Sequence, residues 1–239
     1  MVGLNGYETT TQMIIFPLRK LFYALLLITA VFALLNGLLG LEHFLNDGED
    51  MRQTYVFLDL DTEANLPTWF TTVLLFCSSL CAALIAALRR HASAPLWPYW
   101  WAVSGIFLYL SVDEATQLHE SWGNIHPAIA QLDGVFHYSW VVPALALVAL
   151  SALIFAKFFF SLPQRTQRLL LLASAVYLLG AIGMEMLKAY MLTVWETGEG
   201  TVTGVLVIVE ESLEQIGASL FLVTFLAYLK SLTPSVKLT

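Results

Sequence analysis

The segment 108–122, LYLSVDEATQLHESW, places ionisable side chains at the end of an otherwise apolar stretch. These side chains are Asp113, Glu114, His119 and Glu120. Carboxylates and imidazoles are costly to place in lipid, so in a membrane segment they face the protein interior and mark functional sites. A continuous helix would put Asp113 and Glu120, seven residues apart, on one face with Gln117 between them. We therefore expect this segment to form one wall of a polar site.

Two other apolar segments carry charged side chains, namely Glu185, Lys188, Glu210, Glu211 and Glu214. At 1.5 Å per residue, Asp113 and Glu185 each lie about 24 Å from the inner end of their segments, and Glu210 lies about 12 Å from the outer end of its own. The three segments thus bring carboxylates to a similar depth. Gly180 and Gly183 precede Glu185 and would permit close packing of a neighbouring helix.

So many carboxylates at one depth need neutralisation, and a metal ion would supply it. Carboxylates with histidine suit Fe, Mn or Zn, whereas an all-oxygen set suits Ca or Mg. The predicted ligands of this divalent metal are Asp113, His119, Glu120, Glu185, Glu210 and Glu214. The residues predicted to take part in catalysis are Glu114, Glu211 and Lys188. Such a centre would catalyse hydrolysis by a metal-activated water, or oxidation at a carboxylate-bridged metal pair, of a membrane-associated substrate.

Two other classes of protein stay open. The first is a proton- or cation-coupled transport protein, in which the acids bind and release their ion from the outer side. It is disfavoured because the predicted bundle has no broken helices and no repeated motif between its halves. The second is a structural or assembly subunit whose acids form an internal network, including an i,i+3 ion pair of Glu185 with Lys188. Whether the protein is an enzyme is therefore not decided by the sequence, and neither is its oligomeric state.

The elements that must position these residues are membrane helices. The chain has 239 residues, is 58% hydrophobic and 12% charged, and has a mean hydropathy of +0.73, which indicates an integral membrane protein rather than a soluble domain. A helix needs about 20 apolar residues to cross the bilayer. The predicted spans are 21–41, 67–87, 96–119, 138–160, 169–192 and 202–228. We expect a single all-α domain over 1–239, a polytopic bundle of six transmembrane helices.

The distribution of charge predicts the orientation of this bundle. Nine of the eleven Lys and Arg residues fall on the side that carries both termini, and only Arg52 and Lys188 fall elsewhere. By the positive-inside rule, both termini are cytoplasmic. Of the eighteen Asp and Glu residues, only Glu8 lies on that side. The resulting acidic outer face would attract cations, including a small cationic ligand, and it argues against a nucleic-acid partner. The large apolar surface that faces the membrane would permit a lipid-like ligand.

The longest predicted outer segment is the acidic loop 42–66. Its end, with Asn65 followed by Pro67, is typical of the start of a helix. Glu63 and Asn65 either belong to a solvated loop or fold over the mouth of the bundle and complete its polar site. His137, at the outer end of the fourth predicted span, is a further candidate site residue or a hydrogen-bonded interfacial histidine.

The stretches Glu63-Ala64-Asn65-Leu66-Pro67-Thr68-Trp69-Phe70 and Leu110-Ser111-Val112-Asp113-Glu114, the latter with His119-Glu120, resemble a group of uncharacterised bacterial multipass membrane proteins. In such a cell this topology implies the inner membrane. The resemblance brings no activity with it.

Overall fold

The computed structural model describes residues 17–45, 56–60, 62, 64–122, 132–195 and 201–232, and these ranges contain helices and no strand. The long helices are α1 (Leu18–Leu45), α3 (Leu66–His91), α4 (Trp97–Thr116), α7 (Val141–Ser161), α8 (Gln164–Leu178) and α10 (Thr201–Leu232). The shorter elements are α5 (Leu118–Trp122), the 3₁₀ turn η1 (Gly134–Phe136), the π-helix η2 (Leu179–Met184) and α9 (Glu185–Val194). The all-α class predicted from the sequence is confirmed.

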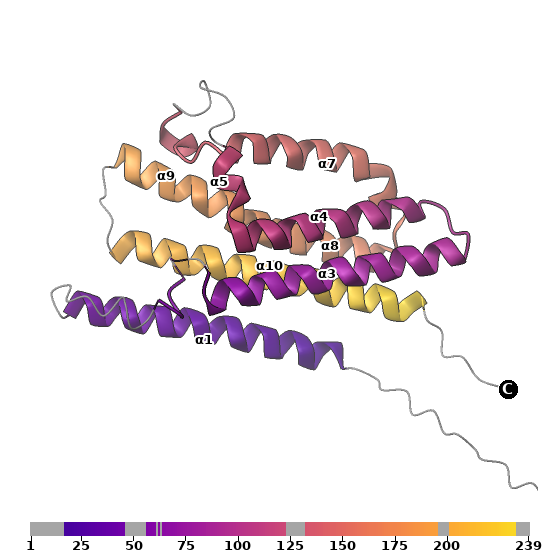
Figure 1. Ribbon diagram of the computed structural model, residues 1–239, viewed down its shortest axis with the longest axis horizontal. Helices are drawn as coiled ribbons and strands as arrows, with labels where there is room; N and C mark the ends of the chain where they lie inside the picture. The colour runs from indigo at the N-terminus through magenta and orange to yellow at the C-terminus, as the bar shows by residue number, and fades with distance from the viewer. Residues whose placement is uncertain are drawn as a thin grey trace, which may run out of the picture.

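Five helical segments of the described chain are long and apolar enough to cross a membrane. They are Leu18–Glu42, Leu66–His91, Val141–Ser161, Gln164–Val194 and Val202–Leu232. The helix α4, predicted as the third span, does not belong to this set, because Trp, Tyr and Pro fill its beginning and Asp113-Glu114 lie near its end. It nevertheless packs along α3, and it runs from the end of the bundle where α3 stops to the point where α5 begins (Figure 1).

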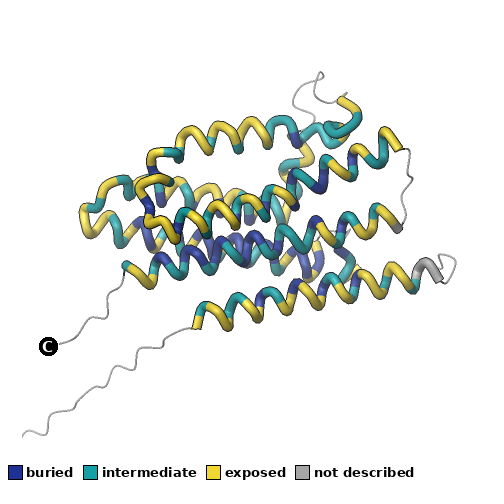
Figure 2. Tube along the Cα trace, turned by 180° about the vertical axis from the view of Figure 1, so that it is seen from behind, coloured by how far each residue is buried: buried dark blue, intermediate teal, exposed yellow. Residues whose placement is uncertain are grey.

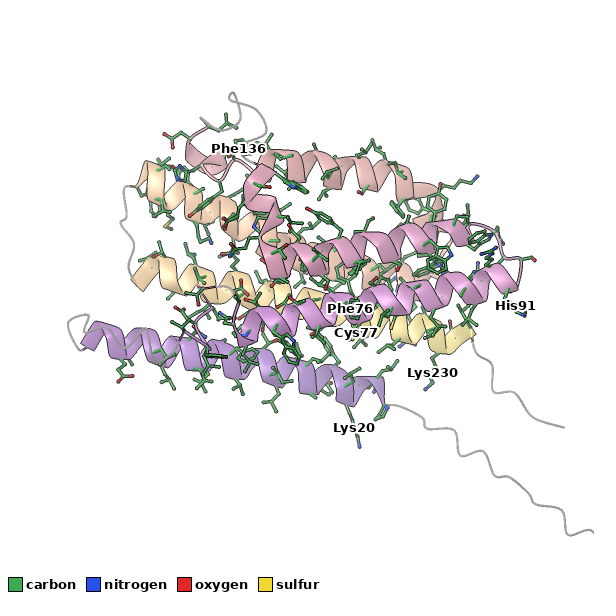
Figure 3. All side chains as sticks on the ribbon, viewed as in Figure 1. Lys20, Phe76, Cys77, His91, Phe136 and Lys230 are labelled. Carbon is green, nitrogen blue, oxygen red and sulfur yellow. The ribbon has the colours of Figure 1, made fainter. Side chains whose placement is uncertain are left out.

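The start of α1 and the end of α10 lie at the same end of the bundle (Figure 1). Lys20, His91 and Lys230 lie at this end, and Phe136 lies at the other (Figure 3). The ends of α3, α7 and α8 that carry Arg and Lys meet here too, so the described basic residues other than Lys188 are segregated at one end. The side of the membrane that this end faces stays a prediction.

Helix α10 is the central element and contacts α1, α3, α8, η2 and α9. Its half that is nearer the basic end packs into an aromatic core, shown as the buried stretch of the tube in Figure 2. Trp100 of α4 is 1% exposed, and it stacks on Tyr228 with ring centroids 5.0 Å apart and meets Phe225 edge-on at 5.8 Å. Phe107 of α4 meets Phe221 at 4.8 Å. By contrast, α7 is peripheral and exposes most of its apolar surface, as a lipid-facing helix does.

Two glycines let α8 and η2 approach α10 at backbone distance. A Cβ placed on Gly217 would lie 2.6 Å from the Cβ and 2.7 Å from the Cα of Tyr177. A Cβ placed on Gly180 would lie 2.9 Å from the carbonyl oxygen of Glu210 and 2.9 Å from Cγ of Glu214. The close packing predicted for Gly180 is therefore confirmed, and it sets the register between η2 and the carboxylates of α10.

The helix predicted over 96–119 is interrupted, which corrects the prediction of one unbroken span with Asp113 and Glu120 on one face. Gln117 adopts the left-handed conformation (φ 54°) and its N–H is bonded to the carbonyl of Asp113 at 2.7 Å. The chain then starts α5 in a new direction (Figure 1). The physical reason is the Asp113 side chain, which accepts the backbone N–H of His119 at 2.7 Å and so stabilises the beginning of the second helix.

The described part of the loop between α1 and α3 is held by two asparagines. Asn36 of α1 donates to the carbonyl of Leu58 at 2.6 Å and accepts the N–H of Leu60 at 2.8 Å. Asn65 caps α3 by accepting the N–H of Thr68 at 3.0 Å, and its amide donates to the carbonyls of Asp59 and Thr62. The predicted helix start at this position is confirmed.

Candidate functional site

The centre of the candidate site is an ion triad of Glu185, Lys188 and Glu210. The ammonium Nζ of Lys188 lies 2.7 Å from Oε2 of Glu185 and 2.7 Å from Oε2 of Glu210, so one lysine joins α9 to α10. The side chain of Lys188 is only 16% exposed, that of Glu185 12% and that of Glu210 10%. The i,i+3 pair predicted from the sequence is confirmed, and Glu210 completes it from a second helix.

The π-helix η2 positions this triad. It ends at Met184, directly before Glu185, inside the apolar segment Gln164–Val194. Single π turns inside α-helices are rare and are often found at functional sites. The close approach of Gly180 to α10 brings this turn against Glu210 and Glu214, so that the first turn of α9 begins beside both carboxylates. A regular α-helix over the same residues would point Glu185 and Lys188 in a different direction, because each inserted residue rotates the helix by about 100°.

Three further carboxylates, Glu114, Glu211 and Glu214, are linked to the triad through Glu214. Glu114 of α4 and Glu211 of α10, together with Glu185 and Glu210, all act electrostatically on Glu214. Carboxylates from α4, α9 and α10 thus interact at Glu214, and the roles predicted for them from the sequence stay predictions. We call the five glutamates and Lys188 the acidic chamber; its members are Glu114, Glu185, Glu210, Glu211, Glu214 and Lys188.

Asp113 and His119 form a second polar group at the break between α4 and α5. The imidazole Nδ1 of His119 lies 3.0 Å from Oδ2 of Asp113, and the His119 ring packs against Trp140 with centroids 4.5 Å apart. The hydroxyl of Tyr109 donates to Oδ1 of Asp113 at 3.4 Å. Asp113 therefore uses both carboxylate oxygens to hold the interrupted segment.

A hollow of about 280 Å³ opens beside the acidic chamber, and Glu120, Tyr138, Ser139, Trp140 and Glu185 line it. The ammonium of Lys188 lies 5.7 Å from the centre of the Tyr138 ring, within cation–π range. Glu120 and Glu185 are thus brought to the same hollow, although Glu120 lies on α5 and not on a continuous third span. This hollow is large enough to admit a small ligand or hydrated ion to Glu185.

The three secondary candidates lie elsewhere or outside the described residues. Glu63 lies outside them. Asn65 uses its side chain to cap α3 and hold the neighbouring loop. His137 is exposed, with Nδ1 at 4.0 Å from Asp133, and its neighbour Tyr138 reaches the hollow.

The predicted metal ligands are divided between these groups. Asp113 and His119 pair with each other, while Glu185, Glu210 and Glu214 lie in the acidic chamber. Within the described ranges, no three His, Cys, Asp or Glu side chains are arranged to hold a metal ion. Lys188, predicted as a catalytic group, occupies the position between Glu185 and Glu210.

Two features of the site were not predicted. The aromatic residues Tyr138 and Trp140 line the hollow and contact Lys188 and His119, and their only sequence signal was their place at the start of an apolar segment. The π-helix is the second such feature, because Gly180 and Gly183 predict close packing and not an irregular turn.

Comparison with known proteins adds a family but no activity. Residues 21–229 match the family model described as Domain of unknown function (DUF8692). The chain belongs to this family. No curated protein and no solved structure matches it. The matched range begins in α1 and ends in α10, so it contains every residue of the acidic chamber.

Proposed function

We propose that the protein binds and releases a cation, a proton or a metal ion, in the acidic chamber of a membrane-embedded helix bundle, and that this ion exchanges with the Lys188 ammonium. The observation that carries the proposal is the position of Nζ, 2.7 Å from a carboxylate on each of two helices. This function is that of a proton- or cation-coupled membrane protein rather than of a fixed metal enzyme.

The balance of charge in the chamber supports cation binding. The acidic chamber contains five glutamates and a single lysine, and the triad itself carries two carboxylates for one lysine. Unbalanced negative charge in a medium of low dielectric attracts a further cation strongly. The hollow beside Glu185 supplies a route by which a proton or hydrated ion reaches the chamber.

The position of Lys188 favours an ion that binds and leaves rather than a metal ion that stays bound. A metal ion bridging Glu185 and Glu210 would need the space that the ammonium holds, so binding of the ion and release of Lys188 are coupled. A proton arriving on the Glu210 carboxylate has the same effect, because it removes the negative charge that holds Nζ. In both cases the link between α9 and α10 is broken when the ion binds.

The π-helix gives this change a mechanical consequence. Because η2 lies directly before Glu185, release of Lys188 from Glu210 frees α9 to rotate about a turn whose hydrogen bonding is already irregular. Movement of α9 would change the hollow, since Glu185 lines it. Exchange at the triad would therefore alter access to the chamber.

In this proposal the acidic chamber lies near the outer, non-cytoplasmic side of the membrane. Its residues belong to the end of α4, to α9 and to the first half of α10, away from the end of the bundle where α1 starts and α10 stops (Figure 1). The excess of Lys and Arg at that end favours a cytoplasmic location for it, with six crossings in which α4 serves as the third. The partners expected are the lipid bilayer and a small cation.

The test uses the purified full chain in proteoliposomes on a solid-supported membrane, with charge movement recorded after a jump of pH or addition of Mn²⁺ or Zn²⁺. We expect a transient charge movement that is lost in Glu210→Gln and kept in Glu42→Gln, which removes a carboxylate near the end of α1. A wild-type signal equal to that of protein-free vesicles, or one unchanged by Glu210→Gln, would overturn the proposal. Stoichiometric Fe, Mn or Zn retained through purification would instead favour the metal centre predicted from the sequence.

A further inference from the structure

The hollow beside the acidic chamber is built by three segments that lie far apart in the chain. Its lining consists of Glu120 from α5, Glu185 from α9, and the consecutive residues Tyr138, Ser139 and Trp140 that lead into α7. The turn η1, which lies just before these three residues, packs against α9. Two carboxylates and two aromatic rings are thus held around one space of about 280 Å³.

The ring of Trp140 is held in place by the break between α4 and α5. The His119 ring packs against it with centroids 4.5 Å apart, and Asp113 holds His119 through the imidazole at 3.0 Å and the backbone N–H at 2.7 Å. The same break starts α5, which carries Glu120 to the hollow. Asp113 therefore positions one aromatic wall and one carboxylate, and a site formed in advance in this way binds a ligand at a low cost in ordering.

The wall formed by Tyr138 and Glu185 already holds an ammonium group. The Nζ atom of Lys188 lies 5.7 Å from the centre of the Tyr138 ring and 2.7 Å from Oε2 of Glu185. The faces of Tyr and Trp rings attract cations within about 6 Å, and ammonium ligands are commonly bound by such rings. Two of the five lining residues thus bind an ammonium that the protein itself supplies.

The negative charge at the hollow exceeds the positive charge of Lys188. This lysine is shared between Glu185 and Glu210, so it leaves one carboxylate charge of the triad unbalanced. Glu120 adds a further carboxylate to the lining. Glu120 is exposed and Glu185 is buried, so one carboxylate is open to solvent and the other lies at the protein interior. A monovalent cation in the hollow reduces the repulsion between these groups.

The aromatic walls favour an organic cation over a metal ion. The face of an aromatic ring is not a metal ligand, so the rings of Tyr138 and Trp140 contribute little to binding of a bare ion. An alkylammonium group gains from both kinds of wall, because its carbon atoms contact the rings while its charge is attracted by the ring faces and the carboxylates.

The depth of the hollow suits the headgroup of a lipid. Val141, which directly follows Trp140, begins an apolar segment long enough to cross a membrane. Tyr and Trp residues at the start of such a segment lie at the level of the lipid headgroups. An ammonium group can therefore reach the hollow from the membrane surface or from solution.

We propose that this hollow binds a small organic ammonium group, carried either by the headgroup of a phospholipid or by a free amine. The rings of Tyr138 and Trp140 contact its carbon atoms, and Glu120 and Glu185 neutralise its charge. This site goes beyond the proposed function and does not depend on it, because Lys188 keeps its place in the triad when the organic ammonium binds.

Two measurements on the full chain separate the two sources of the ammonium. The first is equilibrium binding of radiolabelled choline and ethanolamine to the protein in nanodiscs of phosphatidylglycerol, a lipid whose headgroup has no ammonium. A free amine predicts saturable binding that the uncharged carbon analogue of choline does not displace. The second is native mass spectrometry of the protein released from nanodiscs with equal amounts of phosphatidylglycerol, phosphatidylcholine and phosphatidylethanolamine. A lipid headgroup predicts that one of the two ammonium lipids is retained in preference to phosphatidylglycerol.

The same substitutions test either form of binding. Tyr138→Leu and Trp140→Leu should weaken it at least about fivefold, because each removes one ring face. Tyr138→Phe keeps the ring and should bind within about twofold of the wild type, which separates loss of the ring from a defect in folding. Glu120→Gln, at an exposed position, should weaken binding about twofold to fivefold. Tyr190→Leu is the matched control, because the Tyr190 ring meets Trp195 at 6.1 Å and does not line the hollow.

The site is refuted if neither free ammonium binds and neither ammonium lipid is retained, or if Tyr138→Leu and Trp140→Leu bind as tightly as the wild type. Displacement of choline by its uncharged analogue at equal concentration would also refute it, because the hollow would then select for shape and not for charge. Charge movement at the acidic chamber is recorded in a separate assay. Loss of this site therefore leaves the proposed exchange at Lys188 intact, and an absent charge movement leaves this site intact.

Discussion

Gly217 of α10 and Tyr177 of α8 meet backbone to backbone: a Cβ on the glycine would lie 2.6 Å from the Tyr177 Cβ and 2.7 Å from its backbone nitrogen. Neither atom belongs to the mobile end of a side chain, so one helix would have to shift to admit a methyl group. Gly180 makes the same kind of contact one turn further along, beside Glu210. The position of the acidic chamber thus depends on two residues that have no functional groups of their own.

Replacement of this glycine tests that dependence. We expect Gly217→Ala to destabilise the protein by about 1–3 kcal/mol through overpacking, and to reduce the pH-jump signal because Lys188 and Glu210 are moved apart. Gly204→Ala in the same helix is the control, since nothing lies within 4 Å of its added Cβ. Its Tm should stay the same or rise, as expected for glycine replaced in a helix. Equal Tm values in thermal unfolding of both variants would refute the close contact.

The ion triad predicts a steep loss of stability when its lysine is removed. Lys188→Met leaves Glu185 and Glu210 without their shared cation, and breaking a buried ion pair in this way costs about 3–5 kcal/mol. Adding Glu210→Gln to Lys188→Met removes one of the two stranded charges and should recover part of the loss. Denaturant titration in detergent measures both variants. A double variant less stable than Lys188→Met would argue against a direct interaction.

Asn65 has two roles that different substitutions can separate: its side-chain oxygen caps α3, and its side-chain amide holds the preceding loop. Asn65→Ala removes the acceptor for the Thr68 N–H and the amide donor to the loop, and we expect a loss of about 0.5–2 kcal/mol from the cap. Asn65→Asp keeps the cap and removes the donor, so it should be more stable than Asn65→Ala and still increase amide exchange near Leu58 and Leu60. If the two variants unfold at the same temperature, the cap contributes nothing.

The break at Gln117 depends on Asp113. Asp113→Ala removes the acceptor of the His119 N–H and of its imidazole, so the short helix α5 should lose order. Amide hydrogen exchange measured over Leu118–Trp122 is expected to become faster, while exchange in α4 before residue 110 stays unchanged. Asp113→Asn retains an oxygen acceptor and should have an intermediate effect. Protection of α5 in Asp113→Ala at the wild-type level would contradict this account of the break.

The membrane helices were predictable because length and apolar composition determine them locally. The prediction of 67–87 differs from α3 (Leu66–His91) by one residue at its start and by four at its end, where Arg89 and Arg90 continue the helix past the apolar run. The Glu185–Lys188 pair was equally predictable, since three residues of helix determine its geometry.

The features that the sequence did not predict depend on side-chain and backbone contacts beyond the local apolar pattern. The break in the third predicted span follows from the Asp113 side chain folding onto the next turn, and an apolar pattern cannot distinguish this from a continuous helix. Membership of Glu210 in the triad follows from the backbone contact at Gly180, which requires the packing of η2 on α10.

The exchange of Lys188 for a cation at Glu185 and Glu210 is tested most directly by infrared difference spectroscopy of the protein in lipid. Spectra recorded between neutral and acidic pH, and with and without Mn²⁺, report carboxylate groups that gain a proton or a metal ion. The account predicts a carboxyl band that appears on acidification and is absent in Glu210→Gln, and a shift of that band in Lys188→Met. A difference spectrum that is the same in Glu210→Gln as in the wild type would contradict it.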